Sequence, residues 1–242
     1  MPLWPMLMGE IGGGGGPTGP IILDGTAEHG TANTASPATT ALVTTLTDNL
    51  LIAAWSGSRG TSVVATVNTV TSTSGLVWTR IGEIDSSLDS GARHGRLSLW
   101  TAFAPVALGA EIVQFNLSSS VVCNCVAVAA FHGVVGSSGV YVLDGTVLSD
   151  ADDSTHPSVT MTTTHANDLL VFSSMGVFPS SNNTEPTGFV RDSRQQLSFG
   201  LFTGTLGLSH KIPLATQSGL VLEVPGVGAG VGLCIAFALK GS

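Results

Sequence analysis

The sequence predicts an all-β fold: a jelly-roll-like antiparallel β-sandwich built from two similar halves, with an extended N-terminal arm. Three observations predict it. Short segments rich in Val, Thr, Ile and Phe recur between turns rich in Gly, Ser, Asn and Asp, as expected of strands. No segment shows the 3.6-residue apolar period of an amphipathic helix. The same series of segments also occurs twice along the chain.

Residues 1–20 form the arm. MPLWPMLMGEI is a short apolar peptide, and it is followed by five consecutive glycines, residues 12–16. A run of glycines pays a high entropic cost to hold one conformation, so it predicts a flexible tether. We expect the apolar peptide to anchor the chain to another subunit, because exposed apolar groups usually mark interaction sites; a terminus without fixed structure is the alternative. The expected anchor residues are Met1, Leu3, Trp4, Met6, Leu7, Met8 and Ile11.

Clean alternation marks individual strands of the body. Segments 62–70, 97–103 and 111–117 each repeat with a period of two, which is the signature of a half-buried strand. In the last of them, Val113 belongs to an apolar face and Gln114 to the opposite face.

Matching segments predict an internal duplication. Loops absorb the differences in spacing between the matches, and chance similarity between two sets of strands is the alternative. The matching segments are TTLTDNLLIAAWSG at 44–57 with TTHANDLLVFSSMG at 163–176, LSLWTAF at 97–103 with LSFGLFT at 197–203, the strand with Val113, Phe115 and Leu117 with the strand containing Leu220, Leu222 and Val224, and VAVAAFHG at 126–133 with CIAFALKG at 234–241.

The duplication divides the body into a first half, residues 21–135, and a second half, residues 136–242. No Pro-rich or charged linker lies near residues 135–160, so we expect one continuous body rather than two tandem sandwiches. The residues expected to superpose, and to be buried, are Leu50 with Leu169, Phe115 with Leu222, and Phe131 with Leu239.

The composition indicates a folded chain with few surface charges. Hydrophobic residues make up 43% of the 242 residues and charged residues 10%, against about 25% charged in typical domains. Sparse charge fits a surface buried against other subunits, or a compositional bias of the genome. The net charge of −8 with no run of Lys or Arg argues against a nucleic-acid partner. No apolar stretch approaches the length of a membrane helix, so no membrane partner is expected.

The sequence offers no recognisable active site, and we expect neither enzymatic activity nor a cofactor. The six histidines form no HExxH pair, and there is no GxSxG elbow. Cys123 and Cys125 share one face of a strand and, with Cys234, are a candidate metal site. Their Val neighbours favour buried, metal-free thiols instead.

Two weaker sets of binding residues remain. Asp150, Asp152 and Asp153 cluster in one predicted loop and are candidate calcium ligands, although Asp-rich turns are common for local reasons. Aromatic side chains stack on sugars when they are exposed and otherwise belong to the core. The candidate carbohydrate-binding residues are Trp55, Trp78, Trp100 and Tyr141.

The order of five segments resembles that in β-sandwich modules of tailed-bacteriophage and gene-transfer-agent structural proteins, of the minor tail, neck and head-spike type. The segments are DNLLIAAWSG, GLVWTRIG, LSLWTAFAP, GAEIVQFNLSSS and VAVAAFHGV. The resemblance covers roughly residues 41–134, with a weaker second copy up to residue 242. It is a pattern of strands and turns that carries over no catalytic residue. It implies a virion component, often a homotrimer, that contacts other virion proteins such as the portal or adaptor, tail or capsid.

We therefore expect a non-enzymatic virion structural protein of the tail, neck or head surface, attached to the particle through its N-terminal arm. A carbohydrate-binding module that recognises a host-surface glycan is the alternative. An enzyme of the lectin-like sandwich class, such as a polysaccharide lyase, fits least, because the chain has one tyrosine and no basic cluster.

Overall fold

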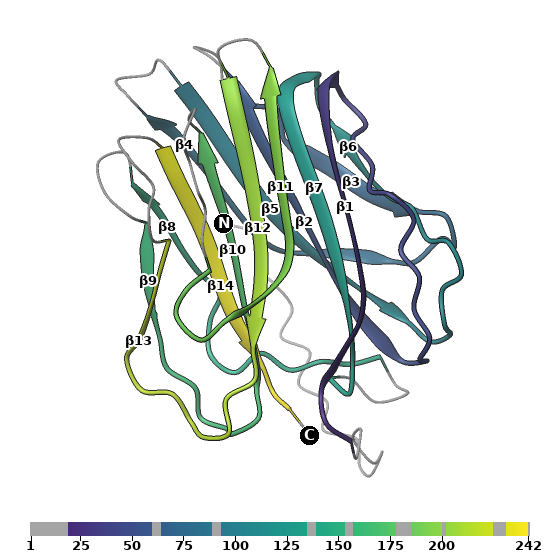
Figure 1. Ribbon diagram of the computed structural model, residues 1–242, viewed down its shortest axis with the longest axis vertical. Coiled ribbons are helices and arrows are strands. Elements are labelled where there is room, and N and C mark those ends of the chain that lie inside the picture. Colours follow the sequence, from purple (N-terminus) through teal and green to yellow (C-terminus); the bar gives the residue numbers. More distant parts are fainter. Residues whose placement is uncertain are drawn as a thin grey trace, which may run out of the picture.

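The computed structural model describes residues 19–59, 64–88, 93–134, 139–152, 157–177, 185–199, 202–224 and 231–241. Every helix or strand in these ranges is a β-strand, which confirms the predicted fold class (Figure 1). Among the same residues, no helix has the length and hydropathy of a membrane span. The anchor residues predicted in the arm lie outside the described ranges.

The described residues form fourteen strands. They are β1 (Ile22–Thr34), β2 (Asn49–Arg59), β3 (Val67–Ser72), β4 (Trp78–Leu88), β5 (Arg93–Ala104), β6 (Val113–Leu117), β7 (Val121–His132), β8 (Leu148–Asp152), β9 (Ser158–Met161), β10 (Leu169–Val177), β11 (Val190–Phe199), β12 (Phe202–Lys211), β13 (Leu220–Glu223) and β14 (Val231–Leu239).

Each half of the chain forms a five-stranded and a two-stranded sheet, but the small sheets are built differently, because β3 follows β2 along the chain whereas β9 precedes β10, the counterpart of β2. Strands β1 to β7 make a five-stranded sheet of order β1-β7-β2-β5-β4 and a two-stranded sheet of β3 and β6. Strands β8 to β14 make a five-stranded sheet of order β8-β14-β10-β12-β11 and a two-stranded sheet of β9 and β13. The large sheets match strand for strand, since β8, β14, β10, β12 and β11 take the places of β1, β7, β2, β5 and β4. This shared order confirms that the fold consists of two similar halves.

The register of the strands agrees with two of the three predicted superpositions, Leu50 on Leu169 and Phe131 on Leu239. Leu50 of β2 lies opposite Phe131 of β7, and Leu169 of β10 lies opposite Leu239 of β14. These four residues therefore form corresponding pairs. All six residues named in the prediction are buried: Leu50, Phe115, Phe131, Leu169, Leu222 and Leu239.

The third superposition, Phe115 on Leu222, is wrong by two residues: Leu42 bridges to Glu111 and its counterpart Met161 pairs with Leu220, so Leu222 corresponds to Val113. The predicted match of residues 97–103 with residues 197–203 is also wrong, because residues 197–199 belong to β11; Leu97 lies opposite Ser56 as Leu206 of β12 lies opposite Met175.

A β-bulge recurs at the same place in both halves. Strand β4 is irregular between Arg80 and Gly82, and β11 is irregular between Arg191 and Ser193. Both strands pair with the same type of neighbour, β5 in one half and β12 in the other. Bulges persist within families of related structures, so this repeat adds to the case for duplication.

The two five-stranded sheets pack face to face and share the main core. Two further cores fill the space between each large sheet and its two-stranded sheet. Figure 1 accordingly shows β3 and β6 on one side of the molecule and β9 and β13 on the other. Segments such as Leu169–Phe172 are apolar without alternation because the large sheets are covered on both faces.

Candidate functional site

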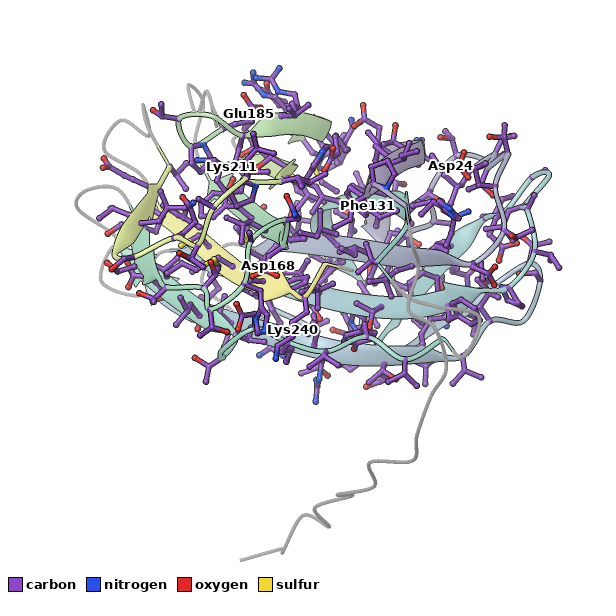
Figure 2. All side chains as sticks on the ribbon, turned by 90° about the horizontal axis from the view of Figure 1, so that it is seen from below. Asp24, Phe131, Asp168, Glu185, Lys211 and Lys240 are labelled. Atoms are coloured by element: carbon purple, nitrogen blue, oxygen red, sulfur yellow. The ribbon has the colours of Figure 1, made fainter. Side chains whose placement is uncertain are left out.

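A tetrapeptide, Leu-Asp-Gly-Thr, occurs at residues 23–26 and again at residues 143–146. It brings one aspartate, Asp24 or Asp144, to the same corner of each half. Leu23 lies opposite Phe131 of β7, and Leu143 bridges to Leu239 of β14. Since Phe131 and Leu239 correspond, the two aspartates correspond as well. Figure 2 shows the two corners from below, with Asp24 in the first half and Asp168 marking the second.

In the first half, Asp24 stabilises the turn that leads into β2. Its carboxylate accepts hydrogen bonds from the Thr45 backbone N–H (3.1 Å), the Thr45 hydroxyl (2.7 Å) and the Leu46 N–H (2.8 Å). The side-chain amide of Asn49 completes the corner, because its Nδ2 donates to Asp24 Oδ2 at 2.9 Å and to the Leu46 carbonyl at 2.7 Å. Burial raises the pKa of Asp24, but these donors outweigh it and hold the pKa below its usual value.

In the second half, Asp144 fastens the turn before β10 in the same way. It accepts hydrogen bonds from the Thr164 N–H (2.5 Å), the Thr164 hydroxyl (2.5 Å) and the His165 N–H (3.1 Å). Both turns also contain a residue with positive φ, Asp48 at 55° and Asn167 at 60°. Asp and Asn tolerate this left-handed conformation better than other side chains, which explains their presence there.

The two corners differ at the residue that completes them. Asp168 takes the place of Asn49 and is fully buried. Its Oδ1 accepts a hydrogen bond from the Gly241 N–H at 3.2 Å. Its Oδ2 meets no donor among the residues that the structure describes, and it is buried. The group that interacts with the Asp168 carboxyl from the other side is the Asp144 carboxyl.

The pKa values of the two carboxyls are driven apart. Burial, together with the hydrogen-bonded Asp144 carboxyl, raises the pKa of Asp168 to about 6. Burial also acts to raise the pKa of Asp144, but the hydrogen bonds from Thr164, Asp168 and His165 prevail and hold it well below its usual range. Two adjacent carboxyls of this kind bind one proton between them over a wide pH range.

His165 adds a third titratable group at this corner, in the place of Leu46. Its Nδ1 lies 3.5 Å from Asp144 Oδ1 and 2.8 Å from the Thr164 hydroxyl oxygen. One atom each of Asp144, His165 and Asp168 lies within 4.8 Å of the others, a spacing that a metal ion can span. The oxygens of Asp144, however, already accept three hydrogen bonds from the turn. In the first half, the amide of Asn49 closes the same corner by donating one hydrogen bond to Asp24. A proton shared by the two carboxyls would supply the same hydrogen bond, so the geometry fits a proton better than a metal ion.

A second buried pair lies between the halves. Asp192, the extra residue of the β11 bulge, has Oδ1 at 2.5 Å from Nδ1 of His210 on β12. The His210 ring meets Phe131 of the first half edge-on, with ring centroids 5.1 Å apart. Burial raises the pKa of Asp192 against the opposing effect of His210. The pair joins β11, β12 and β7 at the contact between the two large sheets.

The four aromatic residues considered for carbohydrate binding do not share one exposed face. Trp55 is fully buried, and its Nε1 donates to Asn124 Oδ1 at 3.0 Å. Trp100 is 7% exposed and lies in the same core between β3–β6 and the first large sheet, where Trp78 is half-buried. Tyr141 packs against the other face of that sheet, in the core between the large sheets.

The candidate calcium residues are only partly described. Asp150 and Asp152 lie in β8 and not in the predicted loop. Asp150 accepts a hydrogen bond from the Ser158 N–H at 2.9 Å, which links β8 to β9. The side chains of Asp152 and Asp153 lie outside the described part of the structure.

The three cysteines are buried, and none of them forms a disulfide. Cys125 lies in the core between the large sheets, whereas Cys234 lies in the core beneath β9 and β13. Burial raises the pKa of Cys123, and it raises the pKa of Cys125 and of Cys234 to about 12. All three are therefore thiols at neutral pH, and the set predicted from the sequence does not converge on one point.

Sequence reasoning did not single out Asp24, Asp144 or Asp168. An exact repeat of Leu-Asp-Gly-Thr was the signal that could have found the first two. The matched segments at 44–57 and 163–176 already contained the third, as the exchange of Asn49 for Asp168.

Comparisons with known proteins supply no relative. No protein-family model matches the chain, and neither a curated protein nor a solved structure matches it.

Proposed function

We propose that this chain is a non-enzymatic structural protein of a virus particle, located at the tail, neck or head surface. The observation that carries the proposal is the duplicated sandwich. The segments on which the resemblance to phage structural modules rests fall on five strands of the first half. DNLLIAAWSG covers most of β2, GLVWTRIG begins β4, LSLWTAFAP ends β5, GAEIVQFNLSSS contains β6 and VAVAAFHGV ends β7.

The use of the buried polar groups supports a structural role. Asp24 and Asp144 hold turns, and Asp192 with His210 joins strands at the contact between the halves. Each of these side chains forms a hydrogen bond within the body. Buried polar side chains whose hydrogen bonds are satisfied make a fold rigid, and a structural protein needs a rigid fold.

Attachment to the particle is assigned to the N-terminal arm. Burying one large apolar side chain contributes roughly 1.5–3 kcal/mol, so three or four anchors exceed the cost of ordering a short arm on a partner. The glycine tether lets the arm reach a site of different symmetry. The body assembles as a homo-oligomer, with a trimer favoured by the phage resemblance, and the arm contacts another virion protein.

The test measures whether a truncated chain is incorporated into particles. Deleting residues 1–16 leaves the body folded, as judged by circular dichroism, but the protein is absent from purified particles when copy number is measured by mass spectrometry. A matched control keeps residues 1–11 and replaces the five glycines by an equally long Gly-Ser tether, and it incorporates normally. Normal copy number of the truncated chain would overturn the anchoring role, and absence of the wild-type chain from particles would overturn the virion role.

A further inference from the structure

We propose that Asp168 is held as the neutral acid and donates its proton to Asp144, so that this corner acts as a pH-sensitive latch in the second half alone. The inference is independent of the virion role. It rests on the comparison of two corresponding corners within one chain, one closed by an amide and the other by a carboxyl.

The neutral acid has the hydrogen-bonding capacity that the position requires. In the first half, Asn49 supplies a donor, Nδ2, that meets Asp24 Oδ2 at 2.9 Å. An ionised carboxylate has no donor, whereas a carboxylic acid has one O–H and one carbonyl oxygen, in nearly the shape of an amide. Asp168 Oδ1 acts as the acceptor for the Gly241 N–H, and Oδ2 is the buried oxygen without a donor. One proton on Oδ2 restores the pattern of the first half.

The charged surroundings of Asp168 are few. From the segment before β8 it meets Asp144, and from the turn before β10 it meets His165. From the end of β14, the described contact is the backbone N–H of Gly241. Asp144 favours the protonated form of Asp168, and a positive charge on His165 opposes it. Asp144 has the larger effect of the two and also forms the hydrogen bond, so the protonated form prevails.

Ionisation of Asp168 would open the latch. The corner ties together three segments: residues 142–145, residues 164–168 and the end of β14 at residues 240–241. Because the folded-state pKa of Asp168 lies above the unfolded value, the stability it contributes is complete at acid pH and is lost as the pH rises through about 6. Above that pH two buried carboxylates repel each other, while the Asn49 corner does not change.

The experiment compares the full chain with D168N and N49D by urea denaturation between pH 4 and pH 8. A shift of the Asp168 pKa from 3.8 to about 6 makes the unfolding equilibrium constant of the wild type rise on the order of 100-fold over this range, relative to D168N. N49D transplants the pair into the first half and gains a second pH dependence of the same sign. Carbon-13 NMR of the wild type places the Asp168 titration near pH 6.

Three results would overturn the latch. Parallel pH profiles for the wild type and D168N would show that no proton is held at Asp168. An Asp168 carboxyl that titrates near pH 4 in the wild-type spectrum would do the same, and this measurement stands even if D168N does not fold. Stabilisation of the wild type, but not of D168N, by added Ca²⁺ or Mn²⁺ would replace the proton by a cation.

Discussion

At the scale of single residues, exchanges at two positions separate two similar corners: Asp168 stands for Asn49 and His165 for Leu46. Asp24 and Asp144 each receive hydrogen bonds from a Thr side chain and from two backbone N–H groups of a turn. The exchange that changes the group facing the two aspartates is that of Asn49 for Asp168. An amide keeps its donor at every pH, while a carboxyl keeps it only when protonated. A rise in pH through about 6 is therefore expected to change the second corner and to leave the first unchanged.

One prediction at the residue scale concerns Asp24. Asp24→Ala leaves the donors of Thr45, Leu46 and Asn49 without their acceptor, and we expect a loss of about 2–3 kcal/mol in the free energy of unfolding. Because the folded pKa of Asp24 is lowered, its contribution is present above the usual value of 3.8 and is lost as the pH falls below it. Urea denaturation at pH 7 and pH 3 measures both effects. Equal stability of Asp24→Ala and the wild type at pH 7 would show that the carboxylate does not hold the turn.

The residue scale is also where the sequence was least informative. Trp55 and Trp100 are buried, yet nothing in their local sequence separates a core tryptophan from an exposed one. Asp168 looked like an ordinary residue at a strand end, because its partner Asp144 lies in a segment that no local pattern connects to it. Contacts of this kind depend on how distant strands pair, which single-sequence periodicity does not specify.

At the scale of elements, the period-two pattern was confirmed by β6, whose apolar positions Val113, Phe115 and Leu117 are all buried. It was wrong for residues 97–103, because residues 97–102 of β5 are buried on both faces. The runs at 49–55 and 169–172 were harder to interpret from the sequence, because a strand covered on both faces loses its alternation.

The duplication supplied part of what the pattern lacked, since the match of residues 44–57 with residues 163–176 falls on the matching strands β2 and β10. The match of residues 97–103 with residues 197–203 was misleading, because the counterpart of β5 is β12 and residues 197–199 belong to β11. The sequence could not predict the order in which these strands pair.

Adjacent residues of β13 provide an element-scale prediction. Leu222 is fully buried beneath the second large sheet, and its neighbour Val221 is 58% exposed on the opposite face. Leu222→Ala is expected to lower the free energy of unfolding by about 2–5 kcal/mol, because it leaves a cavity. Val221→Ala on the same strand is the control, with a change within about 0.5 kcal/mol. Thermal and urea denaturation compare them, and similar losses for both variants would contradict the assigned face of β13.

At the scale of the whole molecule, the two halves are related by an approximate two-fold exchange. Strand β1 packs against β11, and β4 packs against β8. Strand β8 corresponds to β1, and β11 corresponds to β4. Exchanging the two halves therefore converts the contact of β1 with β11 into the contact of β8 with β4. The shared core is therefore an isologous interface within one chain, of the kind that symmetric dimers use.

This relation predicts how the separated halves behave. A half produced alone exposes the apolar face that includes Leu50 and Phe131, or Leu169 and Phe237, and we expect it to self-associate rather than remain a folded monomer. Co-expressed halves should form a one-to-one complex with a β-type circular dichroism spectrum. Size-exclusion chromatography with light scattering distinguishes these states. A half that is monomeric and melts cooperatively on its own would show that the shared core is dispensable.

The four-layer arrangement has a consequence for hydrogen exchange. Strands β2 and β10 lie in the middle of their sheets, with a paired strand on each side and a core against each face. Their amide protons reach solvent only when the layers separate, so exchange there should report the global free energy of unfolding. The amides of the edge strands β1, β4, β8 and β11 should exchange through smaller, local openings. The slowest amides of this protein are therefore expected in two segments more than a hundred residues apart, Leu50–Ala54 and Leu169–Ser173, exchanging at the same rate.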